Sequence, residues 1–480
     1  MTENSAVAFL QYQQIRRSHW DDIAENIKKY STWSKGYYKR LADIYRFWIP
    51  QGRRILEIGC GGGNLLAALS PSSGVGVDFS ARMIEIAQTT HPQHEWIEAD
   101  AHDLRTLKGP FDVIILSDLI DDLWDVQKVF EEIRRLCHSR TRLMINAYSR
   151  VWELPLLVAG RIGASKPRLE QNWLTVEDVT GLLGLADFEV IRAWQEVLWP
   201  FNTPLLAPLC NRFLVKLWPF KYFGLTNFIM ARPKPQEKTE NPPWVSVIVP
   251  ARNESGNIRR ILKETPQMGA GTEIVFVEGH SSDDTYETMQ RETAAHPKRR
   301  VQIHRQTGIG KGDAVRLGFA AASGDVLMIL DADLTVSPAD LPRFYNALLS
   351  GKADFINGVR LVYPMEDQAM RFFNFLGNKF FSLSFSWLLG QSVKDTLCGT
   401  KVLWKDDYEL IARNRYVFGN FDPFGDFDLL FGAARIGMKI IDMPVRYRAR
   451  TYGETNISRW RHGWLLLRMV AFAARRIKFT

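Results

Sequence analysis

The chain has 480 residues, 46% of them hydrophobic and 24% charged, so two or three globular domains are expected and wholesale disorder is excluded. The formal charge of +8 favours an anionic partner, such as nucleic acid, a phosphorylated substrate or a membrane surface, without choosing among them. Cys60, Cys137, Cys210 and Cys398 lie far apart, which leaves a zinc knuckle and a disulfide framework unsupported. No basic stretch followed by an apolar one opens the chain, so no signal peptide is predicted.

The first half of the chain alternates short apolar runs with helical patterns, which predicts an α/β domain. Residues 55–69 (ILEIGCGGGNLLAAL) indicate a strand, a glycine-rich turn and a helix. Gly59, Gly61 and Gly63 can take backbone angles that are closed to other residues, and they let a ligand approach the main chain closely. A glycine turn alone is a weak signal, because many α/β folds carry one.

Polar side chains at successive strand ends strengthen this prediction. Asp78 ends an apolar run about twenty residues after Glu57, and an acid at that spacing can accept hydrogen bonds from ribose hydroxyls. Asp100 follows a third run, and Ser117 ends a fourth. Acids after successive parallel strands collect at one edge of the sheet, where ligands bind, so the sequence predicts a nucleotide-like cofactor there.

These segments resemble the class I S-adenosylmethionine-dependent methyltransferases over roughly residues 38–232, through LEIGCGGG, GVDFSARMIEIA, EADAHDL and FDVIILSDLIDDLWDVQKVFEEIRRL. The resemblance implies a Rossmann-like fold that binds S-adenosyl-L-methionine. It also implies individual roles at the cofactor: Glu57 and the glycine turn at the amino-acid part, Asp78 at the ribose, Asp100 at the adenine amine, and Ser117 with Asp118 near the methyl group.

One segment departs from the family pattern. LIDDLWD places Asp121 and Asp122 where small-molecule members often have Glu-His, which leaves the methyl acceptor and any general base undefined. A nicotinamide cofactor is the rival interpretation, and the acid before the turn GCGGG disfavours it. A degenerate, non-catalytic cofactor-binding module is a further alternative.

Residues 231–244 (ARPKPQEKTENPPW) are rich in Pro, Lys and Glu and poor in apolar residues, which is typical of a linker. We therefore expect a first domain at residues 1–232, a linker at 233–243 and a second domain at 244–480. The second domain again alternates apolar runs with helical patterns, so mainly parallel sheets are predicted in both halves.

The apolar runs of the second half also end in polar residues. The first run leads through Pro250 to Asn253 and Glu254, and the next one leads to Glu278 and Asp283. The two glutamates could accept protons from the hydroxyls or the base of a nucleotide. These side chains are therefore expected at one edge of the second sheet.

Residues 328–336 (MILDADLTV) contain two aspartates one residue apart, which could form either a metal site or a polar turn. Read as a strand, they put Asp331 and Asp333 on one side, because alternate strand residues share a face. Two carboxylates held together repel unless a cation lies between them, and a hard divalent ion takes carboxylate and phosphate oxygens. A polar turn is the simpler alternative. The glycine loop around Lys311, which could meet a phosphate, favours the metal site.

Residues 244–479 resemble the family 2 glycosyltransferases of the GT-A fold, closest to the branch of dolichyl-phosphate mannose synthases, through VPARNE, VEGHSSDDT, GKGDAVRLGF, DADLTVSPADLP, KDTLCGTKVLW, GNFDPFGDFDLL and RARTYGETNISRWRHGW. The resemblance implies a nucleotide-diphosphate sugar donor, Mg²⁺ or Mn²⁺, a polyprenyl phosphate acceptor and inversion at the anomeric carbon. It implies roles for these residues: Asp331 and Asp333 as metal ligands, Asp426 and Asp428 under the transferring sugar, Arg360 and Arg371 at the lipid phosphate, Arg448 near the donor phosphates, and Pro250, Asn253, Glu254, Glu278, Asp283 and Lys311 at the donor. Arg252 and Thr335 replace a common Tyr and Gln, which puts the identity of the sugar in doubt.

Two segments rich in Phe, Leu and Trp are interrupted by charges, residues 371–390 by Lys379 and residues 460–479 by Arg468. Apolar helices with aromatic residues and a basic fringe can lie in the membrane interface. We therefore expect C-terminal amphipathic helices and a cytoplasmic protein attached peripherally to the cytoplasmic face of a membrane. Helices of a domain core are the alternative.

Together these patterns predict a fused methyltransferase and glycosyltransferase that takes no nucleic acid, because the basic residues lie beside aromatic runs rather than in a groove-reading motif. One alternative is a glycosyltransferase acting on a hydroxyl of a surface glycan, with Asp426 or Asp428 as the base and a non-catalytic first half. A nucleic-acid methyltransferase is the other.

Overall fold

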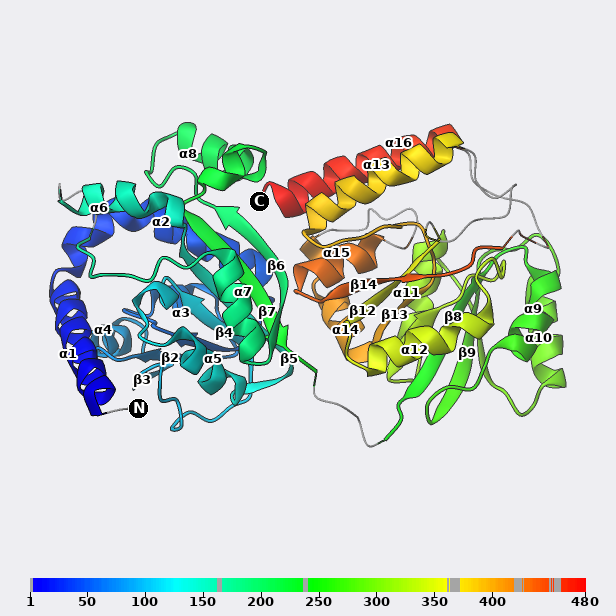
Figure 1. The fold of residues 1–480 in the computed structure, drawn as a ribbon. Coiled ribbons are helices and arrows are strands. Elements are labelled where there is room, and N and C mark those ends of the chain that lie inside the picture. The colour runs from blue at the N-terminus through cyan, green and yellow to red at the C-terminus, as the bar shows by residue number, and fades with distance from the viewer. Residues whose placement is uncertain are drawn as a thin grey trace. The chain divides into compact units, whose positions relative to one another are not determined.

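The computed structural model divides the chain into two compact units, residues Met1–Lys234 with Phe479–Thr480, and residues Pro235–Lys478. It describes residues 3–161, 166–235, 241–360, 362, 372–417, 425, 427–448, 450, 452 and 459–480. Within this described part, each unit is built on a seven-stranded sheet with helices packed against it (Figure 1). The predicted fold class, two successive α/β domains, is confirmed.

The sheet of the first unit has the strand order β3-β2-β1-β4-β5-β7-β6. The five strands from β3 to β5 are parallel, and β7 is antiparallel to both of its neighbours. Its strands are β1 (Arg54–Ile58), β2 (Ser73–Asp78), β3 (Glu95–Glu98), β4 (Phe111–Ser117), β5 (Cys137–Tyr148), β6 (Phe188–Glu196) and β7 (Thr226–Pro233). The central strands β1 and β4 are covered on both faces, which is why they read as nearly continuous apolar runs.

Two helices of the first unit precede β1, and the others lie between its strands. They are α1 (Glu3–Glu25), α2 (Ile27–Trp48), α3 (Asn64–Ala68), α4 (Ala81–Thr90), η1 (Ile120–Asp122), α5 (Val126–Arg134), η2 (Arg150–Trp152), α6 (Glu153–Arg161), α7 (Val176–Leu185), α8 (Leu206–Pro208), η3 (Leu209–Phe213), η4 (Leu214–Lys216) and η5 (Phe220–Phe223). Side-chain caps fix several starts: Ser80 accepts a hydrogen bond from the backbone N–H of Met83 at 3.2 Å, and Asp125 accepts one from Lys128 at 2.9 Å.

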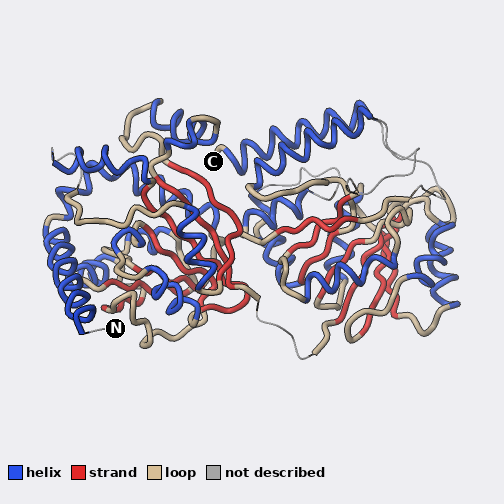
Figure 2. Tube along the Cα trace, in the orientation of Figure 1, coloured by secondary structure: helices blue, strands red, loops and turns tan. Residues whose placement is uncertain are grey.

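The strands of the second unit, red in Figure 2, form a sheet with the order β10-β9-β8-β11-β13-β12-β14. The strands β10, β9, β8 and β11 are parallel, while β13 runs antiparallel between β11 and β12. Its strands are β8 (Trp244–Ala251), β9 (Gly271–Glu278), β10 (Arg300–Arg305), β11 (Val326–Ile329), β12 (Phe355–Val359), β13 (Lys401–Trp404) and β14 (Ile440–Pro444). The carboxyl ends of β8, β9 and β11 therefore meet at one edge.

The helices of the second unit cover this sheet and extend past it. They are α9 (Ser255–Glu264), α10 (Thr285–Ala295), α11 (Lys311–Ala321), η6 (Pro338–Asp340), α12 (Leu341–Leu349), α13 (Phe372–Leu389), α14 (Lys405–Arg413), η7 (Arg415–Val417), α15 (Phe427–Arg435), α16 (Arg459–Ala473) and η8 (Ala474–Lys478). Buried residues of β8, β9 and β11 form the core together with α9 and α12.

The two Phe- and Trp-rich segments form α13 and α16, which lie side by side (Figure 1). Their predicted amphipathic character is not confirmed. Phe385 and Leu466 are buried, but the solvent side also carries large apolar groups, with Leu383 61% and Trp464 66% exposed. Among the described residues, no helix is long and apolar enough to span a membrane.

Candidate functional sites

Two acids hold the glycine turn of the first unit. Glu57, near the end of β1, accepts a hydrogen bond from the backbone N–H of Leu66 at 3.0 Å, and Asp78, the last residue of β2, accepts one from Gly61 at 2.9 Å. Burial raises the pKa of Glu57 to about 8 and that of Asp78 to about 6. Both carboxyl groups would therefore gain from a ligand that offers a cation or a hydroxyl donor.

The turn between β1 and α3 depends on glycine at two positions. Gly59 and Gly63 have φ angles of 74° and 77°, a left-handed conformation that strains other residues. A Cβ at Gly63 would also overlap the ring of Trp96, and one at Gly59 would lie 2.8 Å from a methyl carbon of Leu119. Trp96 and Leu119 thus pack directly on the turn at these two glycines, whereas a Cβ at Gly61 would meet no atom closer than 4.0 Å.

Asp100 is occupied by protein partners. Its carboxylate accepts hydrogen bonds from the backbone N–H of His102 at 2.8 Å and from the Nδ1 of the same residue at 2.6 Å, and the Gln13 amide donates to its other oxygen. Burial acts to raise the pKa of Asp100, but the hydrogen bonds from His102 and Gln13 outweigh it and hold the pKa below its ordinary value. The carboxylate therefore stays ionised.

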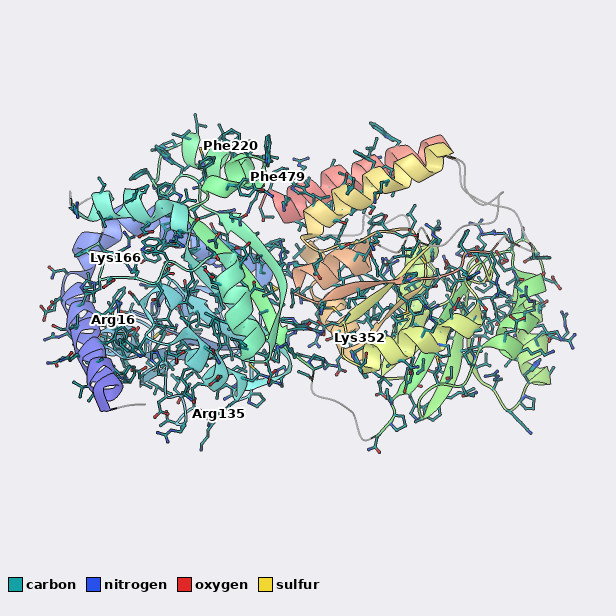
Figure 3. All side chains as sticks on the ribbon, in the orientation of Figure 1. Arg16, Arg135, Lys166, Phe220, Lys352 and Phe479 are labelled. Atoms are coloured by element: carbon teal, nitrogen blue, oxygen red, sulfur yellow. The ribbon has the colours of Figure 1, made fainter. Side chains whose placement is uncertain are left out.

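Helix α1 supplies Gln13 and further contacts to the same edge of the sheet. Arg16, labelled in Figure 3, pairs with Asp122 at 2.9 Å, and Asp21 accepts a hydrogen bond from the Ser80 hydroxyl at 2.5 Å. Loops after β2, β3 and β4 are thus tied to one helix. No sequence signal predicted this role, because α1 carries no motif and its partners lie far away in the chain.

Asp118, next to Ser117 at the end of β4, has a φ angle of 51° and is half-buried. It accepts hydrogen bonds from the Tyr37 hydroxyl at 2.8 Å and the Asn146 amide at 2.6 Å. Burial raises its pKa, although Lys166 and Arg168 act in the opposite direction. An ionisable carboxyl with a raised pKa beside two cations can take a proton from a hydroxyl acceptor.

The two aspartates that depart from the family pattern have other partners. The Asp121 carboxylate accepts a hydrogen bond from the backbone N–H of Tyr148 at 3.0 Å, and Asp122 pairs with Arg16. Asp122 nevertheless lines a pocket beside Asp118, together with Trp20, Tyr148 and Lys166. Lys166 lies 4.5 Å from the ring centre of Trp20. The pocket therefore combines aromatic walls with a cation.

At the corresponding edge of the second unit, the loops after β8 and β9 are tied to each other. The backbone N–H of Asn253 donates to the Ser281 hydroxyl at 3.0 Å, and the Asn253 side-chain oxygen accepts from the backbone N–H of Ser282 at 2.8 Å. Asn253 and His280 both have left-handed φ angles, 57° and 58°. Such outliers cluster where a site holds its loops in fixed positions.

The acids of these two loops take part in the same network. The Glu254 carboxylate accepts a hydrogen bond from the Asn257 amide at 2.8 Å, and Glu278 accepts one from the backbone N–H of Ser281 at 2.5 Å. Asp283 accepts one from the backbone N–H of Thr285 at 3.1 Å. Pro250 lies within β8, one residue before its end. The structure brings these predicted donor residues together at one edge.

The aspartate pair lies beyond the strand rather than in it. β11 ends at Ile329, and Asp331 begins a turn that the backbone N–H of Leu334 closes by donating to the Asp331 carbonyl at 3.2 Å. The prediction that strand alternation orients both carboxylates was therefore wrong, because β11 ends two residues before Asp331. The turn, not the strand, places Asp331 and Asp333.

Each carboxylate of this pair has a basic partner. Lys311, the first residue of α11, places its Nζ 2.7 Å from Asp331, and Arg450 places a guanidinium nitrogen 2.7 Å from Asp333 and another 3.5 Å from Glu254. Burial acts to raise the pKa of Asp331, but Lys311 outweighs it and holds the pKa below its ordinary value. The site is a cluster of paired opposite charges.

No group of three or more His, Cys, Asp or Glu side chains that could hold a metal occurs among the described residues. Two carboxylates still fit a hard divalent ion that takes its remaining ligands from the substrate, since Mg²⁺ is commonly bound by one or two carboxylates plus phosphate oxygens. A bound diphosphate would also offer Lys311 and Arg450 new anionic partners in place of Asp331 and Asp333.

Two glycines let loops from elsewhere approach this cluster. A Cβ on Gly399, just before β13, would overlap the Asp331 carboxylate and the Lys311 amine. A Cβ on Gly425 would lie 2.6 Å from the backbone nitrogen of Gly312, at the start of α11. Gly399 and Gly425 therefore both border the start of α11, which sequence spacing alone does not reveal.

Other predicted residues have separate partners or lie outside the described residues. Arg360 makes a two-pronged pair with Asp395, at 2.7 and 2.9 Å, and Asp428 accepts a hydrogen bond from Arg415 at 2.6 Å. Arg448 is exposed, and its backbone N–H donates to the Thr335 carbonyl at 2.9 Å. Asp426 and Arg371 lie outside the described residues.

Arg450 is the main site residue that sequence reasoning did not single out. It belongs to RYRAR, in which Arg446, Arg448 and Arg450 stand at alternate positions. The alternation indicates that these arginines share one side of an extended segment. Only the contacts of Arg450 with Asp333 and Glu254 identify the one that reaches the acids.

Comparison with known proteins finds a match to one family model within each half of the chain. Residues 55–140 match the family model of a methyltransferase domain, and residues 246–400 match that of glycosyl transferase family 2. The two resemblances are thereby confirmed, and the chain fuses two transferase-type domains.

Curated relatives match the second half. A dolichol-phosphate mannosyltransferase of Pyrococcus furiosus is 28% identical over 219 residues, which are 44% of this chain and 59% of the relative. An undecaprenyl-phosphate 4-deoxy-4-formamido-L-arabinose transferase of Edwardsiella ictaluri is 28% identical over 217 residues, 44% of this chain and 62% of the relative. The chain thus spans less than two thirds of either relative.

Among solved structures, a SAM-dependent methyltransferase of Thermotoga maritima, described as a possible histamine N-methyltransferase, aligns with 45% of this chain and 99% of its own, with 18% identity and a TM-score of 0.38.

Proposed function

We propose that the second unit transfers a sugar from a nucleotide-diphosphate donor to a polyprenyl phosphate. The observation that carries this proposal is the charge cluster at the ends of β8 and β11, where Lys311 and Arg450 pair with Asp331, Asp333 and Glu254. Its acids suit a divalent ion and its cations suit a diphosphate. The names of the Pyrococcus and Edwardsiella relatives, which act on dolichol or undecaprenyl phosphate, support the choice of acceptor.

In this proposal, a phosphate oxygen of the acceptor attacks the anomeric carbon, and the bond from that carbon to the diphosphate breaks. The electron pair leaves with the nucleoside diphosphate. Mg²⁺ or Mn²⁺, held by Asp331 and Asp333, would neutralise charge on that leaving group. Lys311 lies at the N-terminus of α11, so its amine and the helix dipole both favour an anion there. Asn253 and Glu254 hold the loop that borders the nucleotide.

A phosphate acceptor is favoured over a hydroxyl acceptor by the surroundings of Asp428. A hydroxyl needs a general base, whereas a phosphate is already an anion near neutral pH. The Asp428 carboxylate already accepts a hydrogen bond from the Arg415 guanidinium at 2.6 Å, so it is engaged by a protein partner. Arg360 and Arg371 are proposed at the acceptor phosphate, and Arg448 near the donor phosphates.

The test uses full-length protein, Mn²⁺ or Mg²⁺, a panel of labelled nucleotide sugars and a polyprenyl phosphate, with label counted in the organic phase. We expect one donor to give metal-dependent lipid label that the Asp331→Ala, Asp333→Ala variant loses. Asp340→Asn, which changes a carboxylate of η6 beside Arg343, serves as the matched control. Donor hydrolysis without lipid label would refute the lipid acceptor while retaining glycosyl transfer.

We further propose that the first unit binds S-adenosyl-L-methionine and transfers its methyl group. Glu57 and Asp78 suit the ammonium and ribose hydroxyls of this cofactor, and Asp118 stands where an acceptor hydroxyl would lose its proton. Calorimetric titration with S-adenosylhomocysteine tests the binding, with Asp78→Asn expected to weaken it. A methyl-transfer screen on the glycolipid product then tests the chemistry. No binding at millimolar ligand would leave the unit as a scaffold.

We propose that the protein acts at the cytoplasmic face of a membrane, because a polyprenyl chain requires apolar surroundings. The solvent side of α13 and α16 supports this location, since Phe380, Leu383 and Trp464 are all at least half exposed there. Apolar helices of this composition can lie in the bilayer interface.

A further inference from the structure

The connection between the last two strands of the first unit is much longer than it needs to be. β6 and β7 are antiparallel neighbours, and Glu196 pairs with Thr226 at the end where they are joined. A turn of a few residues would suffice there. Residues 197–225 instead form a separate lobe of four short helices, α8 and η3 to η5 (Figure 1). We call these residues the aromatic lobe.

Polar contacts anchor the aromatic lobe to the body of the unit. Lys216 forms an ion pair with the buried Glu196, which Arg40 also contacts at 3.1 Å. The Asn211 carbonyl accepts a hydrogen bond from Arg40 at 3.4 Å, and within the lobe the Asn211 side chain bonds both to the backbone N–H and to the carbonyl of Trp199, at 2.7 Å each. These contacts hold the lobe in a defined position, so its outer surface is a defined part of the folded unit.

That surface is densely apolar. Leu205 is 87% and Trp218 76% exposed, and every other large apolar residue in the following set is at least 39% exposed: Phe201, Leu206, Leu209, Phe213, Leu217, Phe220 (labelled in Figure 3), Tyr222 and Phe223. The Trp152 indole donates a hydrogen bond to the Phe223 carbonyl at 2.8 Å. Trp152 directly precedes α6, so α6 and its exposed Leu154 lie next to the lobe. Clusters of this kind mark an interaction surface.

The charges of the aromatic lobe indicate which kind of partner its surface could bind. Residues 197–225 contain no Asp or Glu, and of their three cations Arg212 and Lys221 reach the surface, whereas Lys216 is buried against Glu196. Lys221 lies 4.9 Å from the ring centre of Tyr222, and Arg212 is exposed. A second copy of this chain docked face to face would bring these cations against themselves. Exposed Trp, Tyr and Leu with cations and no acids instead match the interface of an anionic bilayer.

We propose that the aromatic lobe, together with α6, docks the methyltransferase unit on an anionic lipid bilayer. This docking rests on the proposed function to the extent that the glycosyl acceptor lies in the same membrane. It adds a lipid surface of its own to the first unit, independent of α13 and α16. A methyl acceptor carried on a membrane lipid would then be within reach of that unit.

The test is co-sedimentation of the full chain with vesicles of phosphatidylcholine alone or with about 30% phosphatidylglycerol. Leu205→Ser, Trp218→Ser is compared with Leu10→Ser, Leu185→Ser, a control that removes two leucines more than 60% exposed elsewhere on the same unit. We expect the lobe variant to weaken binding to the anionic vesicles at least about tenfold, and the control to leave it unchanged. Lys221→Glu should weaken it too, whereas Lys108→Glu should not.

The variants are also tested in a chain carrying Leu383→Ser, Trp464→Ser, so that binding through α13 and α16 does not mask the lobe. The proposal is overturned if the lobe variant still sediments like its parent there, if the unaltered chain binds no vesicle, or if the variant only converts a dimer to a monomer. Sugar transfer to soluble farnesyl phosphate, measured without vesicles, reports on the proposed function separately, and the lobe variant should retain it.

Discussion

At the scale of single residues, Gly399 controls how closely the CGT loop approaches the Asp331–Lys311 pair. A Cβ at this position would overlap the Asp331 carboxylate, so Gly399→Ala must displace one of the two. Because misplacement of reacting groups by about 1 Å can cost about 100-fold in rate, we expect a loss of that order in sugar transfer. The measurement is lipid-extracted label per unit time.

The control for this variant is Gly377→Ala in α13, where a Cβ would meet nothing within 4 Å. It should fold and transfer sugar like the unaltered protein, since alanine is favoured over glycine in a helix. Equal activity of Gly399→Ala and Gly377→Ala would contradict the close approach at Asp331.

Asp121 predicts how the stability of the first unit depends on pH. Burial raises its pKa to about 8, and one of its oxygens has no hydrogen-bond partner. The folded state therefore keeps the proton up to about pH 8, while the unfolded state loses it near its ordinary value, so stability falls as pH rises between these points. Asp121→Asn should flatten this fall, by an amount on the order of 1–3 kcal/mol.

Thermal unfolding from pH 5 to pH 8 checks this expectation. Asp43→Asn, which changes a half-exposed carboxylate of α2 beside Arg46, should leave the pH profile as it is. A profile that stays equally steep in Asp121→Asn would assign the fall to other groups, among them Glu57.

At the scale of elements, α1 controls access to Asp100. Gln13 donates to the carboxylate that the family resemblance places at the adenine amine. If the amide and the adenine compete, Gln13→Ala should tighten S-adenosylhomocysteine binding by roughly two- to tenfold, since one hydrogen bond is exchanged for another. Titration calorimetry measures this directly. Weaker binding in Gln13→Ala would instead make Gln13 part of the binding site.

Elements could be predicted from the sequence where the backbone conformation or the burial restricts which amino acids can occupy a position. The turn at Gly59 to Gly63 was readable because left-handed angles select glycine, and β1, β4, β8 and β9 because strands buried on both faces are uniformly apolar. The turn at Asp331 was considered from the sequence only as the alternative to a strand, and nothing in the sequence indicated the left-handed angle of Leu334, which leucine rarely adopts.

Elements whose role depends on contacts with residues far away in the chain could not be predicted in this way. The role of α1 depends on Asp100 and Asp122, which lie about a hundred residues away in the chain. The aromatic lobe reads as ordinary core sequence, since burial and exposure of Leu and Phe cannot be told apart by composition. Arg450 required contacts to distinguish it from Arg448.

At the scale of the whole molecule, each unit has its own sheet and its own buried core. We therefore expect two thermal transitions in scanning calorimetry. S-adenosylhomocysteine should raise the midpoint of one, and a nucleoside diphosphate with Mn²⁺ the midpoint of the other, because a ligand stabilises only the state that binds it. Asp78→Asn should abolish the first shift alone. A single transition that responds to both ligands would contradict independent units.

The raised pKa of Glu57 has a consequence for the thermodynamics of cofactor capture. A carboxyl with a pKa of about 8 is mostly protonated at pH 7, whereas an incoming ammonium group favours its ionised form. Capture would then release a proton into the solution. The measured heat would change with the ionisation enthalpy of the buffer, and the affinity would rise from pH 6 to pH 8. Glu57→Gln would remove both effects.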